Sequence, residues 1–368
     1  HNPKEYNGYK AYWDDGSQLV PPHDKNVIDE VKKVQVSDIK FEGVPEMITI
    51  LGKDFDKKYL DKVKTLSLSP EAIQKEHDLK IVFTPLHGTT YELVPASLRN
   101  WGFTNIHTVP EQSIPDGDFP TVASANPEEP AAFKMALDLA RKIDADLAMA
   151  CDPDGDRIGI AVKNDAGEWT LLNGNQTNII FTEYIIRRKK ELNQLKGGEY
   201  TVKTIVTTEL IKDIAEKNHI ICYDVYTGFK WIADVIRKEG GEKFIGGGEE
   251  SFGYMPGAFT RDKDGVSATS LMAEIAAWVK MQNKTLYSFL KEIYAKYGFS
   301  QERMIYIVRK GLSGAQEIKA MMEEFRHNTP KEINHSPVVL KKDYLSLEAT
   351  NLQTGEKTHL NFETKSDV

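Results

Sequence analysis

The chain has 368 residues, of which 40% are hydrophobic and 28% charged, and its formal net charge is −8. This length exceeds one ordinary domain, so we expect two or three compact units. An acidic chain without a dense block of lysine and arginine is not expected to bind nucleic acid. A phosphorylated ligand would have to be held by local cations and backbone amides.

The cysteines and apolar stretches indicate the compartment. Cys151 and Cys222 form neither a disulfide framework nor a CxxC metal pair, which suits a reducing cytosol. No signal peptide or apolar run of membrane-spanning length is apparent, so no membrane partner is expected. We therefore expect a cytoplasmic protein.

The first predicted unit, 1–75, is rich in turn signals. It opens with HNPKEYNGYK, where Asn2-Pro3 and Asn7-Gly8 are both typical of turns. It ends in SLSPEAIQKEH, where Pro70 opens a short predicted helix. The pattern predicts a tight functional loop at the very start.

From residue 79 the pattern changes to alternating strands and helices. The stretch LKIVF predicts a strand, followed by the loop TPLHGTT and a helix near 92–100. The stretch PAAFKMALDLARKI has apolar residues at helical spacing. It leads into DADLAMACDPDGDRIGIAV, which predicts two apolar strands around an acidic loop. A helix over 176–196 completes the second predicted unit, 76–197.

The third predicted unit, 198–299, repeats this order. Strands at TVKTIVTT, IICYDV and EKFIGG alternate with helices at ELIKDIAEK and FKWIADVIRK, and two covering helices follow. Such alternation predicts an α/β fold with largely parallel sheets. Each unit ends its β-α-β-α-β run in a polar loop, DPDGDR or GGGEESFGY. Ligands of open α/β sheets bind beyond the C-terminal ends of strands, where both loops are expected.

After Gly298 the pattern changes again, and we predict a smaller α+β unit over 300–368. The stretch ERMIYIVRK predicts a strand. Ser313 is predicted to begin a helix, with Gln316 completing a capping box. The fold class is therefore multi-domain α/β, with repeated units and a smaller C-terminal α+β part.

The acidic loop predicts a metal site. Asp152, Asp154 and Asp156 follow a buried strand at alternate positions, and carboxylates so close repel one another unless a cation lies among them. Hard oxygen ligands suit Mg²⁺ or Ca²⁺. A solvated acidic turn is the alternative. An EF-hand is excluded because Arg157 and Lys163 stand where it requires Gly and Glu.

A phosphatase of the haloacid-dehalogenase type also places DxD after an apolar strand. Its pattern requires Thr or Val where this chain has Asp156, which weakens that alternative without removing it. Arg157 beside the metal ligands offers a bidentate donor that suits a phosphate.

The second polar loop predicts sugar binding. Its glycines match a dinucleotide fingerprint only in part, because Ser251 stands where the last glycine is required and no helix start follows. Glu249, Glu250 and Ser251 instead offer the acceptors and the hydroxyl that bind sugar hydroxyls.

Anion-binding candidates flank this loop on both sides. Thr227, Gly228 and Lys230 stand at a predicted helix start, where amide donors and an ammonium group suit an anion. Arg261 and Lys263 lie beside a turn in RDKDG. Taken singly, each of these residues could equally be part of a helix cap or a solvated surface charge. Together with a divalent metal and sugar-hydroxyl acceptors, they indicate a phosphosugar ligand.

These motifs occur in the order known from one family. The stretches HNPKEYNGYK, TPLHGT, NPEEP, DPDGDR, LNGNQ, TGFKWI and GEESFGY, followed by KDG, resemble the α-D-phosphohexomutases, the phosphoglucomutase and phosphomannomutase group. The resemblance runs from His1 to Val368. It implies three related α/β domains and a smaller fourth domain that carries a phosphate-binding loop.

The resemblance also implies a chemistry. A Mg²⁺-dependent phosphoserine passes its phosphoryl group to the sugar phosphate, and the bisphosphorylated sugar reorients and returns its other phosphate. Asp152, Asp154 and Asp156 would hold Mg²⁺, and a bisphosphate of the glucose 1,6-bisphosphate type would be the activator. The phosphoserine would immediately precede His1, and the phosphate loop would follow Val368. We therefore expect the chain as given to bind metal and sugar but not to turn over.

Further roles follow from matching positions. His1 and Lys10 resemble the residues beside the phosphoserine, with Lys10 a candidate proton donor or acceptor for the sugar hydroxyl. Arg157 would face the active site, and Glu249 and Ser251 would hold the sugar hydroxyls. The other candidate ligands of the substrate are Thr227, Gly228, Lys230, Arg261 and Lys263. His87, in TPLHGTT, is assigned to structure.

Two alternatives stay open at this point, a DxD-type phosphosugar phosphatase and a non-catalytic phosphosugar-binding protein. The phosphatase would release free phosphate, whereas a mutase would convert glucose 1-phosphate to glucose 6-phosphate. The sequence does not predict which of glucose, mannose and glucosamine is preferred, nor the oligomeric state.

Overall fold

The computed structural model describes residues 8–302, 305 and 307–366. The chain divides into two units, His1–Gln301 and Glu302–Val368, which are called the first unit and the second unit from here on. Within these residues, no helix combines the length and the apolar character needed to cross a bilayer. Each unit is described below by itself.

The helices of the first unit are α1 (His23–Val31), α2 (Lys53–Lys64), α3 (Pro70–Lys75), α4 (Thr90–Trp101), α5 (Pro130–Ile143), α6 (Gly174–Glu191), α7 (Leu210–Lys217), α8 (Phe229–Glu239), α9 (Gly265–Met281) and α10 (Leu286–Tyr297). Its strands are β1 (Ile81–Thr84), β2 (Ile106–Thr108), β3 (Leu147–Cys151), β4 (Ile158–Lys163), β5 (Trp169–Leu172), β6 (Tyr200–Thr204), β7 (Ile221–Val225), β8 (Phe244–Gly248) and β9 (Tyr254–Met255). The second unit holds α11 (Gly311–His327), β10 (Glu332–Ile333), β11 (Ser336–Pro337), β12 (Leu340–Asp343), β13 (Glu348–Asn351) and β14 (Lys357–His359).

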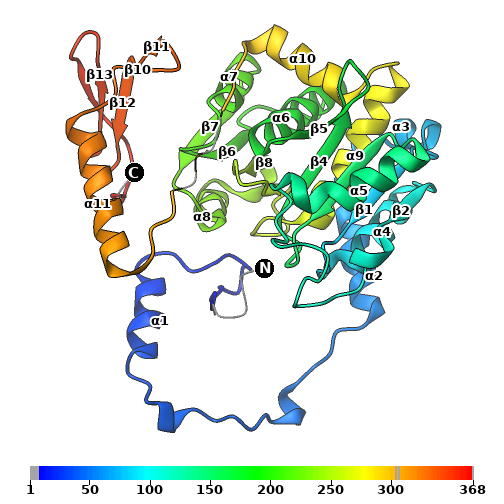
Figure 1. Ribbon diagram of the computed structural model, residues 1–368, viewed down its shortest axis with the longest axis horizontal. Helices are drawn as coiled ribbons and strands as arrows, with labels where there is room; N and C mark the ends of the chain where they lie inside the picture. Colours follow the sequence, from blue (N-terminus) through cyan, green and yellow to red (C-terminus); the bar gives the residue numbers. More distant parts are fainter. Residues whose placement is uncertain (1–7, 303–304, 306, 367–368) are drawn as a thin grey trace. The chain divides into compact units, whose positions relative to one another are not determined.

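The first unit contains two sheets that share the order of their first four strands (Figure 1). One has the strand order β2-β1-β3-β4-β5, in which β1, β2 and β3 are parallel and β4 and β5 antiparallel. The other has the order β7-β6-β8-β9, in which only β9 is antiparallel. The repeated β-α-β-α-β run is thus confirmed, and its last parallel strand is β3 in one sheet and β8 in the other. The multi-domain α/β fold class is confirmed as well.

The first sheet is buried on both faces at its centre, where every residue of β1 and β3 is buried and all but Thr84 are apolar. Side chains alternate across a strand, so Val82, Ala148 and Ala150 point to one face, where they pack with α5. The intervening Ile81, Phe83 and the odd-numbered residues of β3 point to the other face and pack in the larger core with α4 and α9. Two helical layers therefore hold the end of β3 in place.

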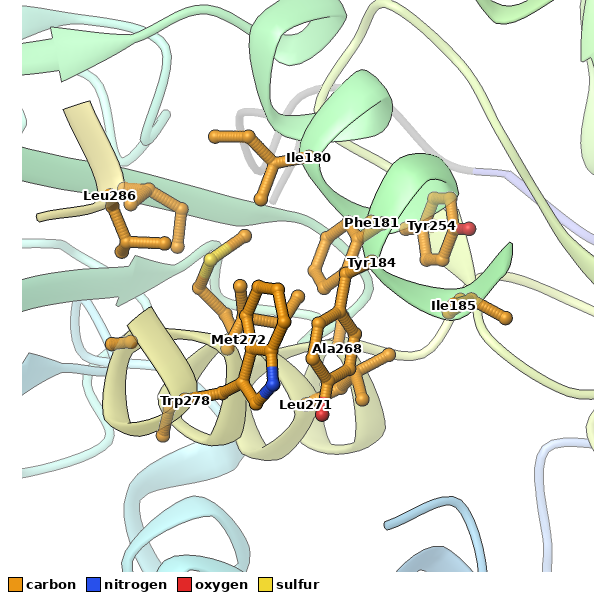
Figure 2. Close-up of a cluster of buried hydrophobic side chains, with 14 of the residues drawn as sticks. Ile180, Phe181, Tyr184, Ile185, Tyr254, Ala268, Leu271, Met272, Trp278 and Leu286 are labelled. Atoms are coloured by element: carbon orange, nitrogen blue, oxygen red, sulfur yellow. The ribbon is translucent and has the colours of Figure 1, made fainter. Parts of the chain in front are cut away.

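Helices α6 and α9 form the shared core between the two sheets. Helix α9 is mainly apolar and is buried on all sides over residues 265–279, whereas α6 is buried over most of residues 174–186 and includes several polar side chains there. Figure 2 shows side chains of both helices in one buried cluster that includes Tyr254 of β9. Phe181 stacks on Tyr254 with ring centroids 4.3 Å apart, and Tyr184 meets Trp278 edge-on at 5.3 Å. Aromatic pairs at these separations add to the stabilisation from burial.

A buried carboxylate fastens the α2–α3 connection to this core. Glu274 of α9 is fully buried and accepts hydrogen bonds from the Ser67 hydroxyl, the Leu68 N–H (2.8 Å) and the Tyr184 hydroxyl (2.7 Å). Burial raises the pKa of Glu274, and these donors oppose the rise. The Tyr184 hydroxyl also lies 2.8 Å from the Ser69 hydroxyl oxygen.

Two local expectations for the second unit are wrong. Residues 302, 305 and 307–310, the described part of ERMIYIVRK, form no strand and are exposed, except for Glu302, which is partly buried. Strands β12, β13 and β14 pair with one another, and none of the described sheets includes residues 302, 305 or 307–310. Helix α11 begins at Gly311, so Ser313 lies inside its first turn and the N-cap is Lys310, without a side-chain cap. The predicted capping box is therefore absent.

We expect Tyr184→Phe to lower the free energy of unfolding of the first unit by about 1–3 kcal/mol, because a buried carboxylate loses one donor while the packed ring remains. Denaturant unfolding followed by the fluorescence of the neighbouring Trp278 measures this. The control is Tyr287→Phe on α10, where the ring is only partly buried, and it should change the value by less than about 0.5 kcal/mol. Equal effects of the two variants would contradict the role of the Glu274 network.

Candidate active site

The acidic loop between β3 and β4 closes on itself through Asp152. Its Oδ1 accepts the N–H groups of Asp156 (3.0 Å) and Arg157 (2.9 Å). Gly155 has a φ of +79°, which suits glycine at this turn. One carboxylate oxygen each from Asp152, Asp154 and Asp156 lies within 4.8 Å of the others. The structure thus brings together the three residues expected to hold a metal.

The charges of this loop fit a divalent cation. Burial raises the pKa of Asp156 to about 6, with Lys263 opposing the rise and Asp152 and Asp154 adding to it. Asp156 Oδ1 is buried and accepts no hydrogen bond from the described residues, and its Oδ2 lies 2.9 Å from Lys263 Nζ. Hard oxygen ligands that repel one another are the donor set that Mg²⁺ prefers.

Arg157 lies between two acidic groups. Its Nη1 is 3.1 Å from Glu128 Oε1, and its Nε is 3.8 Å from Asp152 Oδ2. The side chain keeps 25% of its surface exposed, while that of Glu128 keeps 9%. Glu128 belongs to the NPEEP motif, and its pairing with Arg157 was not predicted, because nothing in the spacing of 29 residues indicates it.

The sugar-loop candidates surround a second buried carboxylate. Glu249 directly follows β8 and is only 5% exposed, and burial raises its pKa. Its Oε1 accepts the Gly228 N–H at 2.5 Å, and its Oε2 lies 3.4 Å from the Ser251 hydroxyl. Asn178 of α6 donates to the Glu249 backbone carbonyl at 2.8 Å. Glu249 therefore links the loop after β8 to the start of α8.

The two polar loops lie side by side. Arg157 forms an antiparallel bridge with Gly253, and the Ile158 N–H donates to the Phe252 carbonyl at 3.0 Å. Lys263 adds a second connection, because its Nζ is near Asp156 and lies 5.3 Å from the centroid of the Phe229 ring at the start of α8. The metal candidates, Lys263, Gly228 and Glu249 thus form one continuous site.

Other predicted residues lie further from this centre or are engaged elsewhere. Lys230 has its Nζ 3.4 Å from Asp24 of α1 and 5.1 Å from the centroid of the Trp231 ring. Arg261 lies beside the Asp15–Gly16 turn, and its charge adds to the hydrogen bond from the Ser17 hydroxyl in lowering the pKa of Asp15. Lys10 is exposed, Thr227 immediately precedes the Gly228 N-cap of α8, and His1 lies outside the described residues.

Tyr12 was missed by the sequence analysis. Its hydroxyl donates to Asp262 Oδ2 at 3.1 Å and so ties the N-terminal segment to the residue before Lys263. Burial, followed by the charge of Asp262, raises the pKa of Tyr12 to about 12. No motif marked this tyrosine, because its partner is distant in sequence.

Comparison with known proteins identifies the family. Three models of one family, phosphoglucomutase/phosphomannomutase, match residues 1–37 (alpha/beta/alpha domain I), 57–167 (domain II) and 173–297 (domain III). Phosphoglucomutases of Staphylococcus aureus strains N315 and bovine RF122 / ET3-1 are 35% and 36% identical over 372 residues, covering 100% of this chain and 66% of each relative. The chain belongs to the phosphoglucomutase/phosphomannomutase family.

Solved structures of phosphohexomutases share the fold. A putative phosphomannomutase from Thermus thermophilus has a TM-score of 0.55 at 22% identity, covering 67% of this chain and 52% of that one. The open form of the phosphoglucomutase pp63/parafusin from Paramecium has a TM-score of 0.54 at 17% identity, covering 83% and 51%. The predicted boundaries at 75, 197 and 299 stay predictions. The family's domain III model begins at residue 173 and so includes α6. The sequence pattern places this helix in the predicted unit 76–197.

We expect Glu128→Gln to lower the free energy of unfolding by about 1–3 kcal/mol, because the partly buried Arg157 guanidinium loses a charged acceptor. Glu129→Gln is the matched control. Glu129 is the next residue, is exposed and accepts a hydrogen bond from the Ser124 hydroxyl, so its loss should cost less than about 0.5 kcal/mol. Denaturant titration of both variants measures the difference, and similar values would mean that the Arg157–Glu128 pair contributes nothing particular.

Proposed function

We propose that this phosphohexomutase interconverts hexose 1-phosphate and hexose 6-phosphate, with glucose, mannose or both as the sugar. The phosphoryl group would be carried by a serine that the family pattern places immediately before His1, and a bisphosphorylated sugar would be the intermediate. The observation that carries the proposal is the backbone pairing of Arg157 and Ile158 with Phe252 and Gly253. It sets a metal-ligand loop against a loop of sugar-hydroxyl acceptors.

The residues of the acidic loop fit the metal that the proposal needs. Asp152, Asp154 and Asp156 would hold Mg²⁺, which supplies positive charge beside a transferring phosphoryl group. Arg157 and Lys263 would bind phosphate oxygens, since both are cations at the edge of this loop and each keeps part of its side chain exposed. A sugar bisphosphate of the glucose 1,6-bisphosphate type would act as activator.

The second loop would bind the sugar in either orientation. The Glu249 carboxylate has lone pairs beyond those used by Gly228 and Ser251, so it can accept from sugar hydroxyls. The N-terminus of α8, at Gly228, offers N–H groups to an anion, with Thr227 and Lys230 beside it. Arg261, Lys10 and His1 complete the proposed site, with Lys10 exchanging a proton with the sugar hydroxyl. A cytoplasmic location is part of the proposal.

Glucose is the first sugar to test because the curated relatives are named phosphoglucomutases. Calorimetry on the chain of residues 1–368 tests binding: glucose 1-phosphate should bind more tightly with Mg²⁺ than with EDTA. Conversion is followed by ³¹P NMR on a protein that adds the expected preceding serine and the expected C-terminal phosphate loop. Glucose 6-phosphate should appear, dependent on Mg²⁺ and faster with glucose 1,6-bisphosphate. Release of inorganic phosphate would indicate a phosphatase, and binding without conversion a non-catalytic protein; either result overturns the proposal.

We expect Glu249→Gln to weaken binding of glucose 1-phosphate by about tenfold, because a neutral amide is a poorer acceptor for sugar hydroxyls than a carboxylate. The exchange keeps the size of the side chain, and the Gly228 N–H keeps an oxygen acceptor. The control, Glu242→Gln, lies in an exposed turn before β8 and should leave the affinity unchanged. A weakening that is the same for inorganic phosphate would show that Glu249 acts on the anion and not on the sugar.

A further inference from the structure

The loop after β1 has an unusual backbone. Leu86 and His87, which are consecutive and carry β-carbons, have φ values of +47° and +63°, and Gly88 follows them. Both side chains are buried. Positive φ is unfavourable for residues with a β-carbon and persists where surrounding contacts demand it. We refer to residues 86–90 as the clamp loop.

The clamp loop contacts the acidic loop at the two residues that separate its aspartates. A Cβ on Gly88 would lie 2.2 Å from the Cα of Pro153, so only glycine permits this approach. The Thr89 N–H and hydroxyl both donate to the Pro153 carbonyl, at 2.8 and 3.1 Å. A Cβ on Gly155 would lie 2.7 Å from Thr90 Cγ2. Thus Pro153 and Gly155, which lie between the three carboxylates, are both held from this side.

His87 fastens the clamp loop to the rest of its domain. Its Nδ1 lies 3.0 Å from the Ile114 carbonyl and its Nε2 2.8 Å from the Thr121 hydroxyl. A neutral ring protonated on Nδ1 donates to the carbonyl and accepts from Thr121, which in turn accepts from the Gln112 side chain at 3.0 Å. The His87 N–H donates to the Gln112 carbonyl at 2.9 Å. The ring contacts neither the aspartates nor their neighbours in these interactions.

We propose that the clamp loop presets the acidic loop for a metal, and that His87 and Gly88 are positioning residues which raise the divalent-metal affinity without touching the ion. The inference rests on the proposed metal site. Three carboxylates that repel one another will separate unless the backbone between them is held. A clamp that holds Pro153 and Gly155 removes that freedom before the metal binds, so less ordering remains at the moment of binding.

The test measures Mn²⁺ affinity on the chain of residues 1–368, using the loss of the EPR signal of free Mn²⁺. We expect Gly88→Ala to weaken binding by at least ~tenfold, the range found when partners behind metal ligands are removed. Gly117→Ala is the matched control, because Gly117 lies in the same domain with no atom within 4 Å of its Cβ position. It should leave the affinity within about twofold. Unchanged affinity in folded Gly88→Ala overturns the inference.

A histidine series keeps the inference testable should Gly88→Ala fail to fold. His87→Ala should weaken Mn²⁺ binding, and His87→Gln, whose amide can replace one of the two ring contacts, should restore part of it. His107→Ala is the control, since His107 lies on β2 with its Nε2 2.7 Å from Asn105 Oδ1. Equal effects of His87→Ala and His87→Gln, or an equal loss in His107→Ala, would show general destabilisation in place of positioning.

A metal-free measurement separates this inference from the proposed function. Hydrogen exchange of the Asp156 and Arg157 amides, which donate to Asp152 Oδ1, reports the order of the acidic loop directly. In Gly88→Ala or His87→Ala these amides should exchange faster, while those of β6 stay unchanged. If the parent chain binds no Mn²⁺, the proposed metal site fails, and faster exchange alone would still support the clamp. Unchanged exchange in both variants overturns the clamp.

Discussion

The site depends on one backbone contact, the antiparallel pairing of Arg157 and Ile158 with Phe252 and Gly253. The acidic loop follows the third strand of one sheet, and the Glu249 loop follows the third strand of the other. Each sheet alone would present half of the candidate site. Pairing between the outgoing segments joins these halves, and the shared core of α6 and α9 fixes the two sheets on either side of it.

The starts of two helices approach the polar loops so closely that they require residues without side chains. A Cβ on Gly265 would lie 2.6 Å from the Gly155 carbonyl oxygen, and one on Gly174 would lie 1.9 Å from the Glu250 carbonyl oxygen. Both glycines open helices, α9 and α6, whose first turns rest against the polar loops. Asp264 caps α9 by accepting the Val266 and Ser267 N–H groups, so the helix start that faces the acidic loop is itself ordered.

Sequence patterns predicted the α/β order, the two polar loops and the three clustered aspartates. They succeeded because strands and helices have a fixed hydrophobic period, and the acidic turn is a short continuous run of the sequence. Patterns could not predict that Glu128 pairs with Arg157, or that Tyr12 bonds Asp262, because both contacts join residues far apart in the chain. The described part of ERMIYIVRK forms no strand for a related reason, since a strand needs a partner that its own sequence does not specify.

The internal repeat extends beyond strand order to the way in which each polar loop is supported. In the first sheet, the loop after β1 holds the acidic loop through Thr89 and the Pro153 carbonyl. In the second sheet, the loop after β6 occupies the equivalent position. The hydroxyls of Thr204, the last residue of β6, and of Thr207 in this loop donate to Glu250 Oε2 at 3.1 and 3.0 Å.

The chemical groups differ, backbone carbonyl in one case and carboxylate in the other, yet the arrangement is the same. The loop after the first strand supports the loop after the third, because parallel strands bring their carboxyl ends to one edge. In a 2-1-3 strand order the first and third strands are neighbours at that edge, so the topology itself supplies the support. Glu250, which adjoins the proposed sugar ligand Glu249, thus supports the shape of its loop through these two hydrogen bonds.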